Sequence, residues 1–137
     1  MDIIDKIKYW VKTTQDDIKC FDSTEKQNIV LQLFIDIANN GNLEYYILEE
    51  NKGLIVYSIF PDFKGDLSLH ELFMFIKSEY RGSYKLFKEL INHIETVAKE
   101  RGCKSIRVGA NIHYKDEKIL RVMQRLGYKT DVVVKYI

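Results

Sequence analysis

The sequence has little of several features that would mark a specialised class of protein. It holds only two cysteines in 137 residues, Cys20 and Cys103, without the spacing of a metal site, so we expect reduced thiols. Lys and Arg total 21 against 20 Asp and Glu, a net charge of +1. No overall field would therefore draw the chain to nucleic acid or to an anionic membrane. These shortages favour a cytoplasmic protein that contacts neither.

Long hydrophobic runs and targeting segments are missing as well. The longest apolar run, Ile29 to Ala38, is interrupted by Gln32 and Asp36 and is too short to span a bilayer. No signal-peptide pattern opens the chain, and no repeat or low-complexity tract divides it. A chain of 137 residues can bury one core, so we expect a single domain over residues 1–137.

The first half of the chain carries two helical patterns followed by a hairpin pattern. Asp2 can cap a first amphipathic helix, and Asp22-Ser23-Thr24 offers capping oxygens to a second one. The apolar positions of these helices are Ile3, Ile4, Ile7, Trp10 and Val11, then Ile29, Val30, Leu33, Phe34, Ile37 and Ala38. Residues 43–48 and 54–60 are rich in β-branched and aromatic residues, which favour strands. Asn51-Lys52-Gly53 between them favours a turn, so we expect a β-hairpin.

The segment from Leu67 to Gly102 reads as a strand, a tight turn and a helix. Its nearly continuous apolar run from Leu72 to Ile76 is typical of a central strand covered on both faces. After Arg81-Gly82 the period becomes helical for about five turns, and Gly102 ends the pattern. Free N–H groups at such a turn, together with the helix dipole, suit an anion.

The last third predicts a βαβ unit and two further elements. Ile106, Val108 and Ala110 alternate in a strand that must run parallel to the central one, because a helix connects the two. Asp116 can cap a short helix that Gly127 stops, and residues 128–137 read as a final strand. The whole order is ααβββαβαβ.

The run from Leu72 to Gly82, with Leu126-Gly127-Tyr128 near the end, resembles the GNAT superfamily of acyl-CoA-dependent N-acetyltransferases. The resemblance is weakest before about Leu43, where the usual first strand is missing, and it is greatest to abbreviated acetyltransferase-like proteins of tailed bacteriophages. It implies an α/β fold with a central mixed sheet and helices on both faces. It also implies acetyl-CoA as the acyl donor and an amine of a small molecule or protein as the acceptor.

The resemblance also implies which residues would hold acetyl-CoA. They are Phe75, Ile76, Arg81, Gly82, Ser83, Tyr84 and Asp116. The family's turn has Arg or Gln, two residues, Gly, one residue, then Gly or Ala. Arg81 and Gly82 match this pattern, but Tyr84 and Leu86 stand where small residues belong, and a register one residue longer puts Lys85 and Phe87 there instead.

Acid and base candidates are few. Acetyl transfer needs a base poised near neutral pH, and the carboxyl and imidazole candidates are Glu71 and His70, which a strand would point to opposite faces. The family's tyrosine falls on Met123, which cannot donate a proton, so Tyr114 or Tyr84 would have to replace it. Zinc is not expected, because the histidines have no partners at ligand spacing.

Two functions follow from these observations. The first is an N-acetyltransferase with Glu71, His70 and Tyr114 as catalytic candidates. The second is a binding or structural protein that kept the fold and lost the cofactor, such as a virion or phage-assembly component, since a fold does not guarantee an activity. Partners left open are the amine acceptor, a second copy of the chain and virion proteins.

Overall fold

The computed structural model describes residues 2–18, 23–40, 42–82, 84–109, 117–129, 135 and 137. The helices are α1 (Ile3–Ile18), α2 (Thr24–Asn39), α3 (Tyr84–Glu100) and α4 (Glu117–Arg125), with short 3-10 turns η1 (Glu49–Asn51) and η2 (Ser78–Tyr80). The strands are β1 (Glu44–Ile47), β2 (Gly53–Pro61), β3 (Leu67–Ile76) and β4 (Ser105–Arg107). The predicted element order is confirmed up to α4, and the strand expected at residues 128–137 falls largely outside the described residues.

Both N-terminal helices begin at the predicted caps. The Asp2 carboxylate accepts a hydrogen bond from the backbone N–H of Asp5 at 2.8 Å, and the Ser23 hydroxyl accepts one from Lys26 at 3.2 Å. Each bond satisfies an N–H group that has no partner inside the helix. Among the described residues, no helix is long and apolar enough to cross a membrane.

The sheet is mixed, with strand order β1-β2-β3-β4. The first two pairings are antiparallel and the β3–β4 pairing is parallel, so β3 is internal in the sheet, as predicted. The hairpin turn is formed by η1, while Gly53 already belongs to β2. A Cβ atom at Gly53 would lie 2.5 Å from the Phe75 carbonyl oxygen, so the close approach of β2 and β3 requires glycine.

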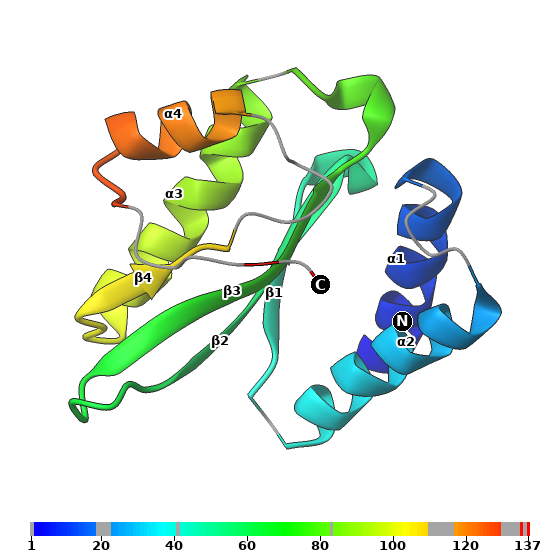
Figure 1. Ribbon diagram of the computed structural model, residues 1–137, viewed down its shortest axis with the longest axis horizontal. Helices are drawn as coiled ribbons and strands as arrows, with labels where there is room; N and C mark the ends of the chain where they lie inside the picture. The colour runs from blue at the N-terminus through cyan, green and yellow to red at the C-terminus, as the bar shows by residue number, and fades with distance from the viewer. Residues whose placement is uncertain are drawn as a thin grey trace.

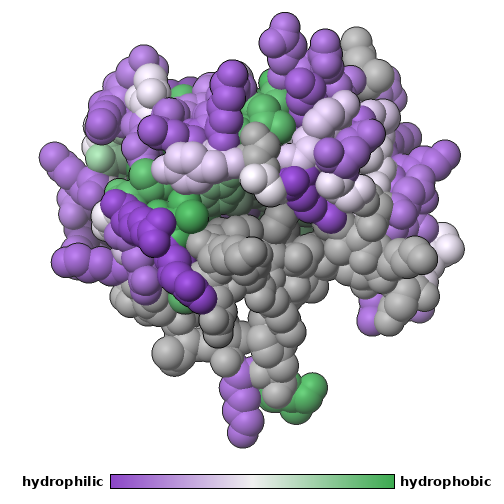
Figure 2. Space-filling model, turned by 90° about the horizontal axis from the view of Figure 1, so that it is seen from above, coloured by the Kyte–Doolittle hydropathy of each residue, from purple (hydrophilic) through white to green (hydrophobic). Residues whose placement is uncertain are grey.

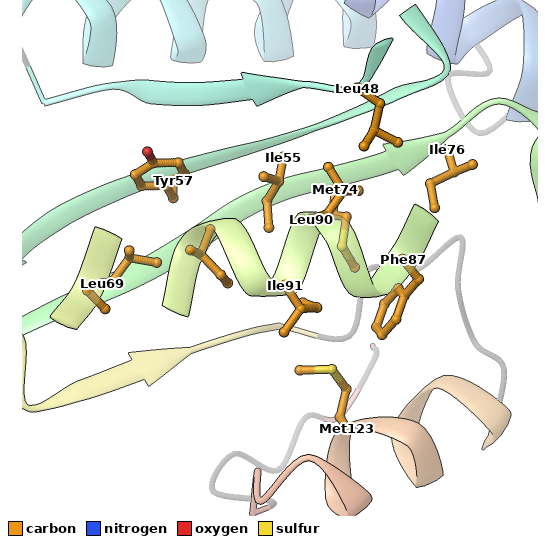
Figure 3. Close-up of a cluster of buried hydrophobic side chains, with 12 residues drawn as sticks. Leu48, Ile55, Tyr57, Leu69, Met74, Ile76, Phe87, Leu90, Ile91 and Met123 are labelled. Atoms are coloured by element: carbon orange, nitrogen blue, oxygen red, sulfur yellow. The ribbon is translucent and has the colours of Figure 1, made fainter. Parts of the chain in front are cut away.

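Helices cover both faces of the sheet, which confirms the predicted α/β architecture. In Figure 1, α1 and α2 lie on one side of the sheet and α3 and α4 on the other. On the α3 side, Leu90, Ile91 and Ile94 are fully buried and pack among strand residues and Met123 of α4 (Figure 3). On the α1 side, Trp10 packs edge-on against Phe75, with their ring centres 6.1 Å apart. Burial of these side chains is the main stabilising term of the fold.

One strand boundary differs from the one that the sequence predicts. The central strand begins at Leu67, as expected, and both its polar first half and its apolar second half pair with β2. The following strand was expected over residues 106–110, but β4 is shorter and ends at Arg107. Beyond Arg107, the Gly109 N–H donates a hydrogen bond to the carboxylate of Glu71 and takes no part in the β3–β4 ladder.

Candidate functional site

A β-bulge in β3 decides where the candidate acid and base side chains point. Val56 pairs with Phe73 and Tyr57 pairs with Glu71, so Leu72 is an extra residue without a partner on β2. The extra residue changes the alternation of faces along β3. Glu71 therefore shares the α3 side with Tyr57, while Phe73 joins the apolar cluster on the α1 side.

Glu71 lies where β3 and β4 part. The parallel ladder joins Ser68, Leu69 and His70 to β4 and goes no further, although β3 continues to Ile76. One carboxylate oxygen of Glu71 accepts a hydrogen bond from the Gly109 N–H at 3.2 Å. Burial raises the pKa of Glu71 from 4.5 to about 7, and the Gly109 bond opposes this rise only in part. The carboxyl group is therefore poised to gain or lose a proton near neutral pH.

His70 lies on the opposite face of β3 from Glu71, as predicted. Its ring stacks on the ring of Phe60 with centres 3.8 Å apart. Among the described residues, its buried Nε2 atom has no hydrogen-bond partner. Burial, with a smaller contribution from Arg107, lowers the pKa of His70 from its ordinary value and favours the neutral ring. The structure therefore does not bring His70 and Glu71 together into one site.

At the turn after β3, Gly82 has a left-handed backbone and the Arg81 side chain folds back onto the strand. Gly82 has φ +88°, a conformation that favours glycine. The Arg81 Nε–H donates to the carbonyl oxygen of Ile76 at 2.8 Å, and the guanidinium lies 5.2 Å from the centre of the Phe75 ring. These contacts of the Arg81 side chain hold the turn against the end of β3.

The remaining predicted donor-site residues divide into two groups. Phe75 and Ile76 have their side chains buried in the two cores, so only their backbone could contact a ligand. Tyr84 is 51% exposed, and its ring is 5.9 Å from the Lys88 ammonium, along the outer surface of α3. Ser83, Tyr114 and Asp116 lie outside the described residues.

A hollow of about 490 Å³ opens beside the turn. It is lined by Glu49, Lys52, Glu79, Tyr80, Arg81, Lys85, Leu86 and Glu89. Figure 2 shows one face of the molecule, on which hydrophilic side chains surround a recessed hydrophobic patch. Three basic side chains balance three acidic ones, so a phosphate would meet both charges in the hollow.

Sequence reasoning missed the contribution of the first hairpin to this hollow. Lys52 and Glu49 come from the β1–β2 connection, which the sequence indicated only as a turn. Tertiary pairing brings it next to the end of β3, where the Lys77 N–H donates to the carbonyl oxygen of Lys52 at 2.9 Å. Gly109 was missed as well, because no local pattern marks the partner of a strand carboxylate.

The scan of family models and the search of curated proteins each gave no match. Solved structures do resemble the chain. A protein from Pyrococcus furiosus proposed to be an acetyl transferase has TM-score 0.74 at 20% identity over 98% of this chain and 93% of its own. A transcriptional regulator from Bacillus halodurans C-125 has TM-score 0.73 at 21% identity, over 97% and 93% of the two chains.

A third similar structure contains a bisubstrate analogue. It is AAC(6')-Iy in complex with the bisubstrate analogue CoA-S-monomethyl-acetylneamine, with TM-score 0.67 and 15% identity over 97% of this chain and 91% of that one. At such identities a structural likeness establishes the fold and leaves the activity open. The chain therefore has the mixed α/β fold of the GNAT acetyltransferases.

Proposed function

We propose that the protein is an N-acetyltransferase that transfers the acetyl group of acetyl-CoA to an amine. The observation that carries this proposal is the Glu71 carboxyl, which is half-buried at the point where β3 and β4 part and has a pKa of about 7. A structural ion pair would lower the pKa of a carboxyl group, whereas a general base for an ammonium group needs a pKa near the working pH.

In the proposed reaction Glu71 removes one proton from the acceptor ammonium. The amine nitrogen then attacks the thioester carbonyl carbon, the new C–N bond forms and the C–S bond breaks. The electron pair of the broken bond leaves with sulfur, the thiolate gains the second proton that the nitrogen loses on becoming an amide, and the proton held by Glu71 passes to solvent. His70 takes no part in this step because it lies across the sheet from Glu71. Tyr114 stays a candidate acid.

Acetyl-CoA would lie between the parting strands, with its phosphates near the turn that leads into α3. The first N–H groups of α3 have no partners within the helix and favour an anion. Lys52, Arg81 and Lys85 supply positive charge around the neighbouring hollow. The acceptor is left as an amine of a small molecule or protein, and a cytoplasmic location remains our expectation.

Donor binding is tested first, by thermal unfolding with and without acetyl-CoA. A ligand at a hundred times its dissociation constant should stabilise the native state by about 2.7 kcal/mol. Arg81→Ala should weaken binding by roughly 1.5–3 kcal/mol if the guanidinium contacts phosphate, the scale of hydrogen bonds to charged groups. Lys12→Ala is the matched control, since Lys12 is an exposed residue of α1. A folded protein that shows no shift at about millimolar acetyl-CoA would rule out the enzyme.

Catalysis is tested by release of the CoA thiol in the presence of a panel of amines that includes aminoglycosides. The wild-type kcat/KM should rise with pH through about 7 as Glu71 loses its proton. Glu71→Gln should lower kcat by about 10²–10⁴-fold while acetyl-CoA still shifts the unfolding temperature. An unchanged rate in Glu71→Gln would remove Glu71 as the base.

A second function is a binding or structural protein without a cofactor, including a virion component. Leu86 favours it, because this half-buried side chain lines the hollow at a position where the family has a small residue. Tyr84→Gly combined with Leu86→Gly tests this. Acetyl-CoA binding by the double variant and not by the wild type would support the cofactor-free protein, at a cost of about 1 kcal/mol of stability for each helix glycine.

A further inference from the structure

The outer face of α2 exposes two large aliphatic side chains side by side. Ile29 is 62% exposed and Leu33 is 56% exposed, one helical turn apart. α2 has no buried residue, although its inner side contacts the sheet through Phe34, which lies edge-on against Phe73 with centres 6.0 Å apart. The apolar arc of α2 is therefore wider than the surface that the rest of the chain covers.

Charged residues flank this aliphatic pair with a regular spacing. Lys26, Ile29, Leu33 and Asp36 are separated by three, four and three residues, which is the a and d spacing of a heptad. At 3.6 residues per turn they fall within about 80° of the helix circumference. All four are exposed, and the Gln32 amide donates to the Asp36 carboxylate at 2.8 Å, which holds that carboxylate on the outer surface.

This stripe is complementary to an inverted copy of itself. In an antiparallel pair with its two-fold axis at the level of Leu31, residues equally far from Leu31 face each other. Ile29 and Leu33 are each two residues from Leu31, and Lys26 and Asp36 are each five residues from it. Two Ile–Leu layers at the centre are then flanked by a Lys–Asp layer at each end. In a pair of two copies of this chain, apolar side chains therefore face apolar side chains, and each charged side chain faces one of opposite charge.

We propose that α2 is a self-association surface, on which two copies of the chain pack α2 against α2 in an antiparallel pair. Ile29 of one copy contacts Leu33 of the other, and Lys26 of one copy pairs with Asp36 of the other. Two apolar layers make a smaller contact than a standard protein interface, so the dimer is weak and forms only at high protein concentration. The pairing does not depend on the proposed acetyl transfer, because α2 contributes no residue to the hollow or to the Glu71 region.

Sedimentation velocity of the full chain from about 10 µM to about 1 mM tests the proposal, since mass action shifts a dimer equilibrium over this range. Leu33→Glu should weaken dimerisation at least about tenfold by placing a charge in an apolar layer. Phe63→Ser is the matched control, because Phe63 is a fully exposed hydrophobic residue in the β2–β3 loop, away from α2. This variant should dimerise like the wild type, and far-UV circular dichroism should be equal for all variants.

Charge reversal tests the antiparallel register itself. Lys26→Glu and Asp36→Lys should each weaken the dimer, because each variant brings like charges together. The two substitutions combined should restore the dissociation constant to within about threefold of the wild type, since opposite charges meet again. A wild type that is monomeric at every concentration, a dimer that Leu33→Glu leaves intact, or a double variant that is not restored would each overturn the proposal.

Discussion

Replacing Glu71 by glutamine should make the protein more stable above neutral pH and hardly change it in mild acid. The native pKa of Glu71 is about 7, against 4.5 for the unperturbed group, because folding buries the carboxyl. A raised carboxyl pKa means that the native state holds the proton more tightly than the unfolded chain. The wild type therefore loses stability as pH rises from about 4.5 to about 7 and stays at the lower value above.

The magnitude follows from the difference between these two pKa values. About 2.5 pKa units at about 1.4 kcal/mol each correspond to roughly 3 kcal/mol. Glutamine has nearly the same shape, cannot ionise, and keeps an oxygen that can accept the hydrogen bond from Gly109. We therefore expect the free energy of unfolding of Glu71→Gln to exceed that of the wild type by roughly 3 kcal/mol at pH 8 and by less than about 1 kcal/mol at pH 5.

Urea unfolding at pH 5, 6, 7 and 8 measures this difference directly. Glu79→Gln is the matched control, because Glu79 is an exposed glutamate of η2 and its substitution should change stability by less than about 0.5 kcal/mol at every pH. Equal gains for Glu71→Gln at pH 5 and pH 8, or a loss at pH 8, would refute the raised pKa. A stability gain together with a loss of acetyl transfer would mean that the Glu71 carboxyl is retained for catalysis at a cost in stability.

Three further predictions concern the fold and the turn. Gly53→Ala should destabilise the protein by roughly 1–3 kcal/mol in urea unfolding, because the new Cβ atom would lie 2.5 Å from the Phe75 carbonyl oxygen. An unchanged free energy of unfolding would contradict this close approach of β2 and β3. Leu90→Ala should cost about 2–5 kcal/mol, since Leu90 is fully buried between α3 and the sheet, and a loss below about 1 kcal/mol would contradict that packing. Gly82→Ala should lower the free energy of unfolding by about 1–2 kcal/mol, because alanine is strained at a φ of +88°. No steric clash adds to this loss, since the space around Gly82 is open. An unchanged thermal unfolding temperature would contradict the left-handed conformation of Gly82.

The sequence alone determined the local features of this fold. Periodicity identified α1 and α2 as helices and located the inner face of α3, because a 3.6-residue repeat of apolar side chains is typical of a helix with one buried face. On α2 the same repeat includes Ile29 and Leu33, which the structure leaves exposed. Asp2 and Ser23 marked helix starts, and Gly102 marked a helix end, because these residues satisfy or permit the backbone geometry of a terminus. The parallel pairing of β3 with β4 followed from the helix that connects them. The order of elements, together with the resemblance of residues 72–82 and 126–128 to the GNAT superfamily, predicted the fold class.

Only the tertiary structure decided the candidate site. The bulge at Leu72 arises from pairing with β2, and no residue in β3 signals it, yet it determines that Glu71 faces the α3 side and Phe73 the α1 side. The pKa of Glu71 depends on burial and on the Gly109 N–H, which lies 38 positions further along the chain. Likewise, Arg81 turns back to Ile76 and Phe75, while Lys52 reaches the hollow from another hairpin. Such contacts join residues that are distant in sequence, so a reading limited to local patterns could name the side chains but could not bring them together.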